Sequence, residues 1–215
     1  MLQPHFLDTV PLDVAVFTCL TSAFWSTVRL GKLTMQNLTT FNSANHIKRS
    51  DLSERVDRNG FKTITIHVPK TKVSLTWGED LYWARQDGPS DPESPLQRHL
   101  TLNSPDEGFH LFRYENGKGK KIPLTKTNFL KHMKVTTTKV KLSALPGHSI
   151  CIGSTLEYLL RSLPFNIMKA KGRWSSDAFH QYLCDHTTIL APYMQSAPPD
   201  TNDHFICIAI PSVHD

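Results

Sequence analysis

Residues 147–194 read GHSICIGSTLEYLLRSLPFNIMKAKGRWSSDAFHQYLCDHTTILAPYM, and they predict three helical segments joined by short turns. The first segment carries an apolar stripe at helical spacing, made of Ile152, Leu156, Leu159, Leu160 and Leu163. The last opens on Ser175-Ser176-Asp177, which suits a helix N-cap, and ends at Pro192. Because the turn Gly172-Arg173-Trp174 lies between them, we expect His148, Trp174 and Tyr182 to converge at this joint.

The order of these features resembles a known family. A histidine that opens an apolar helix, a short second helix, a Gly-x-Trp turn and a later tyrosine are similar to the C-terminal half of the tyrosine recombinase (phage integrase) catalytic domain. GRWSSDAFHQYL, residues 172–183, is especially similar to recombinases of fungal and other eukaryotic mobile elements. The resemblance implies site-specific DNA recombination or integration through a 3′-phosphotyrosyl intermediate. It also implies an α+β, mainly helical core with a small antiparallel sheet beside a helical bundle.

The resemblance further implies a catalytic set made of Arg29, Lys72, His148, Trp174 and Tyr182. Arg29 would bind the scissile phosphate, Lys72 would protonate the leaving 5′-oxygen, and Tyr182 would be the nucleophile. His148 would assist proton transfer, and Trp174 would occupy the family's histidine-or-tryptophan position. No metal or other cofactor is implied, because positioning and charge stabilisation supply the catalysis.

Each of these residues also has a purely structural interpretation. Trp174 and Tyr182 suit core aromatics, and His148 suits a helix cap. Lys72 suits a surface lysine on a hairpin turn, and Lys70 is the second choice for the general acid. The joint order and spacing of the set favour the catalytic interpretation.

Two positions depart from the family pattern. The family's His-x-x-Arg phrase supplies a second guanidinium, whereas this sequence has Cys151 after His148. A cysteine cannot donate a bidentate pair of hydrogen bonds to phosphate. Near Arg29, Lys32 stands where the family commonly has an acid. The sequence therefore predicts an impaired or inactive enzyme. The alternatives are a catalytically dead DNA-binding remnant of a mobile-element recombinase and an interaction protein with no role on DNA.

Positive charge is concentrated in one part of the chain. The 215-residue sequence has a net charge of +5, and residues 113–141 hold nine Lys and Arg against one acid. Residues 79–107 hold seven acids and only two arginines. This asymmetry predicts a surface that faces a polyanion, with a solvated charged face as the alternative. We expect double-stranded DNA as the partner, bound through Lys126, Lys131, Lys134 and Arg173, and the resemblance allows a homo-oligomer on the DNA.

Upstream of residue 147 the pattern predicts both helices and short strands. Helices are expected over residues 11–27, 94–102 and 124–134, and strands over residues 46–52, 61–68, 73–77 and 110–114. The turn Asp57-Arg58-Asn59-Gly60 is expected to join the first two strands. The acidic remainder of residues 78–106 is expected to be loop. NGKGKK, residues 116–121, is expected to be a flexible basic loop suited to the DNA backbone.

One catalytic domain is expected over residues 1–195, without the family's core-binding domain, followed by a proline-rich linker and apolar tail over residues 196–215. Four widely spaced cysteines predict reduced thiols and no metal site. A membrane span, a signal peptide and the phosphate-binding Gly-x-x-x-x-Gly-Lys-Ser/Thr motif are all missing from the sequence. We therefore expect an intracellular protein, nuclear or cytoplasmic, without a membrane or nucleotide partner.

Overall fold

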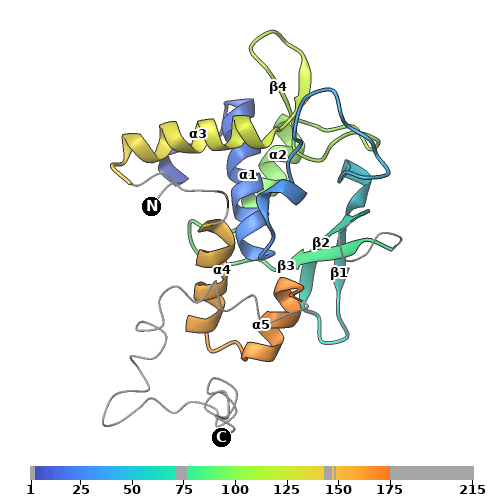
Figure 1. Ribbon diagram of the computed structural model, residues 1–215, viewed down its shortest axis with the longest axis vertical. Coiled ribbons are helices and arrows are strands. Elements are labelled where there is room, and N and C mark those ends of the chain that lie inside the picture. The colour runs from blue at the N-terminus through green and yellow to red at the C-terminus, as the bar shows by residue number, and fades with distance from the viewer. Residues whose placement is uncertain (1–2, 71–76, 143–146, 148, 175–215) are drawn as a thin grey trace, which may run out of the picture. The chain divides into compact units, whose positions relative to one another are not determined.

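The chain divides into two compact units in the computed structural model, residues 1–150 and residues 151–215. The structure describes residues 3–70, 77–142, 147 and 149–174. The first unit contains, in order, α1 (Pro11–Trp25), β1 (Leu52–Val56), β2 (Lys62–Val68), β3 (Glu79–Trp83), α2 (Glu93–Leu102), β4 (Arg113–Glu115), β5 (Lys121–Pro123) and α3 (Lys126–Lys139) (Figure 1). Short 3-10 turns lie at η1 (Gln3–His5), η2 (Leu30–Lys32) and η3 (Arg49–Asp51). α4 (Ser149–Leu160) begins where the first unit ends, and α5 (Phe165–Gly172) belongs to the second.

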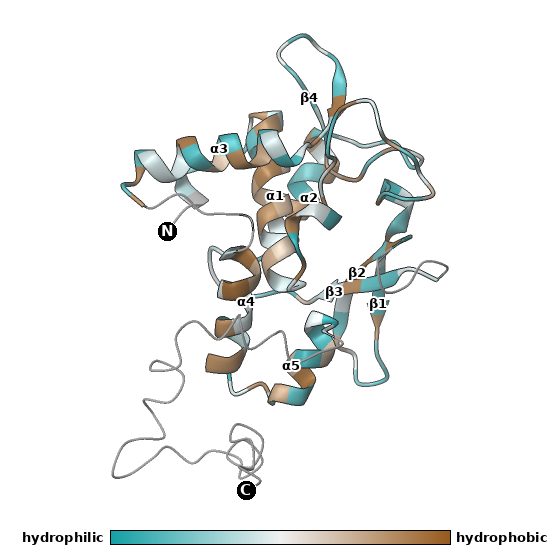
Figure 2. Ribbon diagram, viewed as in Figure 1, coloured by the Kyte–Doolittle hydropathy of each residue, from teal (hydrophilic) through white to brown (hydrophobic). Residues whose placement is uncertain are grey.

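Helix α1 is the centre of the first unit. Its apolar side chains are buried on nearly every side, with Ala15, Val16 and Cys19 fully inaccessible, and Figure 2 shows its apolar colouring. A helix that is apolar all round is buried on all sides, and α2, α3, β3 and β4 pack against α1. The Thr18 hydroxyl donates to the Pro95 carbonyl at 2.8 Å, which joins α1 to α2. The helix predicted over residues 11–27 is confirmed.

A three-stranded antiparallel sheet in the order β1-β2-β3 lies beside these helices. Ile64 and Ile66 of β2 pair with Trp83 and Leu81 of β3, and all four side chains are buried. Strand β1 is the exposed edge. The turn after β1 forms as the sequence predicts, because the Asp57 carboxylate accepts hydrogen bonds from the backbone N–H of Asn59 and of Phe61, each at 2.8 Å. An α+β, mainly helical architecture with a small antiparallel sheet is thus confirmed.

Several predicted boundaries differ from the structure. The strand expected over residues 46–52 is wrong, because β1 begins only at Leu52. Just before it, the Lys48 backbone N–H donates to the Asp51 carboxylate at 2.9 Å, which folds residues 49–51 into η3. Strand β3 was expected to be loop. Most of the strand predicted over residues 73–77 lies outside the described residues.

Two histidines are buried where α2 meets the segment before β4: His99 belongs to α2, and His110 precedes β4. The His99 Nε2 donates to the Leu111 carbonyl at 2.9 Å, and its Nδ1 accepts from the Asn103 amide at 2.9 Å, so the ring is neutral. Burial lowers the pKa of His99 to about 4. Burial, with repulsion from His46 and His99, lowers the pKa of His110 to about 3.

Candidate nucleic-acid interface

The end of α1 places Arg29 at the surface of the first unit. Thr27 adopts φ 52°, in the left-handed region. Its backbone N–H donates to the Phe24 carbonyl at 3.0 Å, and that of Val28 donates to the Ala23 carbonyl at 3.1 Å. These two bonds form a Schellman motif, in which a left-handed residue reverses the chain after a helix. Val28 then turns into the core and the next residue, Arg29, is exposed.

Lys32 lies close to Arg29 along the chain. Arg29 is the N-cap residue of η2, and the backbone N–H of Lys32 donates to the Arg29 carbonyl at 2.9 Å. The exposed and partly exposed cations Arg29 and Lys32 therefore share one short turn. This segment can attract an anion such as phosphate, although the lysine cannot orient the guanidinium as an acid would.

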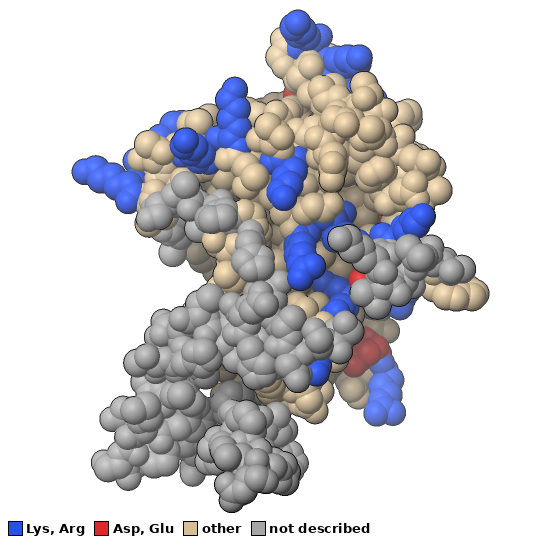
Figure 3. Space-filling view, in the orientation of Figure 1, with Lys and Arg blue, Asp and Glu red and all other residues tan. Residues whose placement is uncertain are grey.

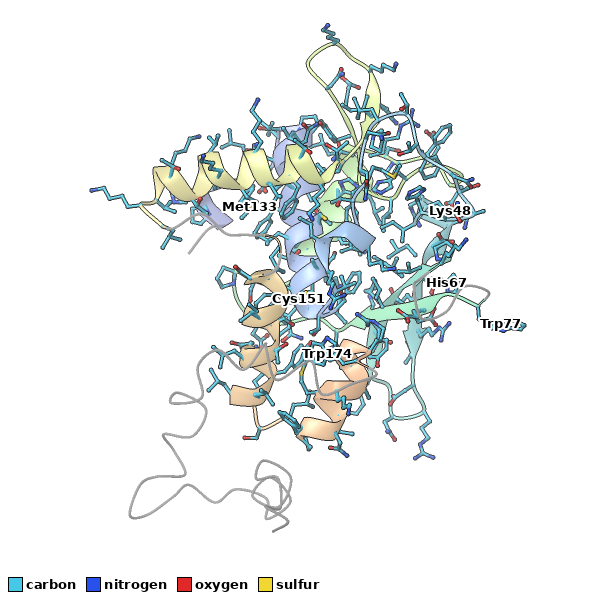
Figure 4. All side chains as sticks on the ribbon, viewed as in Figure 1. Lys48, His67, Trp77, Met133, Cys151 and Trp174 are labelled. Carbon is cyan, nitrogen blue, oxygen red and sulfur yellow. The ribbon has the colours of Figure 1, made fainter. Side chains whose placement is uncertain are left out.

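Helix α3 presents a face of lysines. Phe129, Met133 and Thr137 are buried on its inner side, and Met133 is labelled in Figure 4. On the opposite side, Thr127, Lys131, Lys134 and Thr138 are exposed and follow helical spacing, with Lys126 exposed at the helix start. We call Lys126, Lys131 and Lys134 the α3 lysines. Figure 3 shows basic side chains gathered over α3, where acidic ones are sparse.

The position of α3 is fixed at its start and along its length. The Thr125 hydroxyl caps the helix by accepting from the Asn128 backbone N–H at 3.1 Å. The Lys126 backbone N–H donates to the Met35 carbonyl at 2.8 Å. His132 contacts the Asp13 carboxylate of α1 at 3.0 Å. Among the residues the structure describes, none of the α3 lysines forms an ion pair, so their charges face solvent.

In the second unit, the turn after α5 holds Arg173 and Trp174. Arg173 has φ 57°, and its backbone N–H donates to the Ala170 carbonyl at 3.1 Å. The Trp174 backbone N–H donates to the Lys169 carbonyl at 3.2 Å. A Cβ at Gly172 would overlap the Trp174 ring, so the glycine leaves room for the tryptophan. This close approach is a physical reason for a Gly-x-Trp phrase.

Cys151 is a core residue of the second unit. Its side chain is 2% exposed and clusters with Leu159 and Met168, and Trp174 packs against that cluster (Figure 4). Cys19, in the first unit, is likewise fully buried, and burial raises the pKa of its thiol well above the ordinary value. Both side chains lie among apolar core groups. Cys184 and Cys207 lie outside the described residues, so reduced thiols at all four cysteines stay a prediction.

Lys171 is a polar residue whose position the sequence pattern does not predict. Its Nζ lies 4.7 Å from the centroid of the Tyr158 ring, a cation–π distance. Burial, and then the charge of Arg173, lower its pKa to about 8. The only signal in the sequence was the phrase Lys-Gly-Arg-Trp, which does not show that a lysine folds back over an aromatic ring.

The predicted catalytic set is only partly within the described residues. Arg29 lies in the first unit and Trp174 in the second, whereas Lys72, His148 and Tyr182 lie outside the described part of the chain. Their assembly therefore stays a prediction. Over the described ranges, no group of three or more His, Cys, Asp or Glu side chains could hold a metal ion. No helix in the described ranges is long and apolar enough to span a bilayer.

Comparison with solved structures identifies the fold as tyrosine recombinase-like, with a small sheet and a set of helices. The chain is similar to FLP recombinase in a Holliday-junction complex, with a TM-score of 0.51 and 14% identity over 91% of this chain and 44% of that one. It is also similar to Flpe in a Holliday-junction complex, with a TM-score of 0.49 and 13% identity over 94% of this chain and 46% of that one. The chain thus spans less than half the length of those recombinases. No model of a protein family matches the sequence, and no curated protein does.

Proposed function

We propose that this chain acts on double-stranded DNA as the catalytic portion of a tyrosine recombinase. The observation that carries the proposal is the fold, which is similar over 91% of the chain to a recombinase solved with a Holliday junction. The sequence order Arg29, Lys72, His148, Trp174 and Tyr182 supports it, as does the solvent-facing charge of the α3 lysines. We further propose origin in a mobile element, assembly of several copies on DNA and a nuclear site of action.

The proposed reaction exchanges one phosphodiester for another. The Tyr182 hydroxyl attacks phosphorus in line and passes its proton to His148, and the bond between phosphorus and the 5′-oxygen breaks. Lys72, assisted by His148, protonates that departing oxygen, while Arg29 stabilises charge on the non-bridging oxygens. The 3′-phosphotyrosyl link preserves the phosphodiester energy, so a 5′-hydroxyl from a second strand can reverse the step. No metal ion or nucleotide takes part in this scheme.

Cys151 predicts that this reaction is slow. Its place in the family pattern belongs to a second arginine, and its thiol lies in the apolar cluster of the second unit. Loss of one preorganised donor at such a site typically lowers the rate by about 10²- to 10³-fold. A chain that binds DNA but joins to it only weakly is the expected result.

A covalent adduct with DNA tests the catalytic proposal. The protein is incubated with nicked duplex DNA, denatured and run on a gel on which a protein–DNA adduct migrates as a separate band. We expect a faint band for the natural chain and a stronger one for Cys151→Arg. Circular dichroism checks that Cys151→Arg is folded, because a buried cation is costly in an apolar cluster. The matched control Cys151→Arg/Tyr182→Phe should give no band, and a folded Cys151→Arg without a band would count against the proposal.

A second candidate function is DNA binding without catalysis, which the α3 lysines and the buried Cys151 favour. Binding of duplex DNA should then depend steeply on salt, because each neutralised phosphate releases counterions. Replacing Lys126, Lys131 and Lys134 with Gln should make the negative slope of log binding constant against log salt concentration shallower by about 2.7, at about 0.9 per lost contact. Tyr182→Phe should bind as the natural chain does. Binding that is indifferent to salt would remove this candidate.

A further inference from the structure

The tip of the β4–β5 hairpin is ordered by its own hydrogen bonds. The Asn116 side-chain oxygen accepts from the backbone N–H groups of Lys118 and Lys120, each at 3.0 Å. The Asn116 backbone N–H donates to the Lys120 carbonyl at 3.0 Å, and that of Gly119 donates to the Asn116 carbonyl at 2.9 Å. Gly119 has φ 71°, which glycine adopts without strain. The loop predicted to be flexible therefore has a defined, hydrogen-bonded conformation.

Two cations hold the base of the hairpin. The Arg113 guanidinium pairs with Asp106 at 2.8 Å, donates to the Lys121 carbonyl at 3.2 Å and lies 4.2 Å from the centroid of the Phe109 ring. The Lys121 ammonium donates to the Ser104 carbonyl at 2.9 Å. Arg113 and Lys121 are thus engaged in holding the hairpin in place.

The remaining cations of the hairpin, Lys118 and Lys120, point outward. Both are exposed, and neither forms an ion pair with another residue in the described part of the chain. An added Cβ at the neighbouring Gly117 or Gly119 would meet nothing within 4 Å, so the space beside both lysines is open. A partner can therefore approach the backbone of the tip closely.

The hairpin is also tied to α3. Tyr114 of β4 is 4% exposed, and the Asn128 side-chain amide of α3 donates to its hydroxyl at 3.3 Å. Only Leu124 and Thr125 separate β5 from α3, and both are buried. Figure 1 shows the hairpin projecting from the start of α3, and Figure 3 shows basic side chains at its tip as well as over the helix.

We propose that the hairpin tip is a second, preformed contact with the phosphate backbone of duplex DNA, beside the α3 lysines. This inference rests on the proposed function. A second contact beside the α3 lysines would fix the orientation of the duplex on the first unit. DNA presents one charge per about 1.7 Å of helix axis, so cations at two fixed places on one body match a long, stiff polyanion. The ordered tip loses little conformational freedom on binding, which favours affinity. A disordered acidic protein would not require this fixed spacing.

The salt dependence of duplex binding tests the inference. Lys118→Gln/Lys120→Gln should make the negative slope of log binding constant against log salt concentration shallower by about 1.8, at about 0.9 for each lost contact. Asn116→Ala keeps every charge but removes the two side-chain hydrogen bonds of the tip. Its affinity should fall by about 3- to 10-fold with the slope unchanged, because ordering the loop then costs about 1 kcal/mol at binding.

A charge-matched control separates this contact from general electrostatics. Arg55→Gln/Lys62→Gln removes two cations that already pair with acids, Arg55 with Asp80 at 3.5 Å and Lys62 with Glu54 at 2.9 Å. This control should keep the natural slope. If the hairpin variant also keeps it while neutralised α3 lysines lower it, the hairpin inference is wrong and the proposed function stands. If duplex binding does not depend on salt in any of these proteins, the hairpin inference and the proposed function are both wrong. Equal affinity for polyglutamate and for duplex DNA would contradict the assignment of nucleic acid as the partner.

Discussion

Acidification from pH 8 to pH 5 should destabilise the first unit, because two of its histidines are buried in the neutral form. The pKa is about 4 for His99 and about 3 for His110, below the 6.5 of an unperturbed histidine. The unfolded chain therefore takes up protons first as the pH falls. The free energy of unfolding of the first unit therefore has its full value above about pH 6.5, and it decreases as the pH falls toward the pKa values of the folded chain.

The size of the effect follows from these pKa values. At pH 5 each ring is almost wholly protonated in the unfolded chain and almost wholly neutral in the folded chain. Linkage then gives a loss of about 2 kcal/mol per histidine, or about 4 kcal/mol for the pair. Burial also lowers the pKa of His132, so this residue acts in the same direction. Since domains are stable by only about 5–15 kcal/mol, the change is easily measured.

Urea denaturation followed by circular dichroism at pH 5, 6, 7 and 8 measures this loss. His110 is the residue to change, because its Nδ1 is buried with no hydrogen-bond partner among the described residues. Because His110 accounts for about half of the expected loss, His110→Leu should remove about half of the difference in the free energy of unfolding between pH 8 and pH 5. His5→Gln, at an exposed histidine, is the matched control and should leave the difference unchanged. Equal stability at pH 5 and pH 8, or an unchanged pH dependence in His110→Leu, would show that the buried imidazoles do not destabilise the protein in acid.

Three further outcomes follow from the structure. Gly172→Ala should destabilise the second unit by about 1–3 kcal/mol, because the added Cβ overlaps the Trp174 ring. Urea denaturation measures this loss. Gly108→Ala is the control, since nothing lies within 4 Å of the Cβ it adds. The acylation rate of Lys171, followed by mass spectrometry, should rise with a midpoint near pH 8, the pKa set by burial and Arg173, and Arg173→Gln should move that midpoint upward; a midpoint above pH 10 in the natural chain would contradict this. Asp13→Ala should cost about 2–3 kcal/mol in the same denaturation assay, because the Leu7 N–H and His132 would lose their acceptor, while the exposed Asp8→Ala should change little.

Much of the fold follows from regular patterns in the sequence. The α1 and α2 helices, β2 and the turn at residues 57–60 are all readable, because periodic apolar residues and Asn-Gly chemistry act locally. The sequence does not predict β3, because Glu79 and Asp80 open it within an acidic, proline-rich stretch. Only pairing of Leu81 with Ile66 and of Trp83 with Ile64 shows the strand. The strand expected over residues 46–52 does not form, because the Asp51 carboxylate accepts a hydrogen bond from the Lys48 backbone N–H and residues 49–51 form a 3-10 turn instead.

The site is less predictable than the fold because it depends on tertiary contacts. The sequence identified the α3 lysines, whose charge and helical spacing are local properties, and the structure places them on an exposed face. It did not show that Asn116 would order the hairpin tip or that Lys171 would lie over Tyr158, since both depend on how the chain folds back on itself. The burial of Cys151 likewise follows from packing against Leu159 and Met168.

A crystal structure of the chain bound to duplex DNA would show whether Arg29 and Tyr182 form one recombinase site. The measurement is the separation between the Arg29 guanidinium, the Tyr182 hydroxyl and the nearest backbone phosphate. We predict that both groups lie within hydrogen-bonding reach, about 3 Å, of the oxygens of one phosphate. A structure with Arg29 and Tyr182 on opposite surfaces, and with no phosphate between them, would contradict a recombinase site.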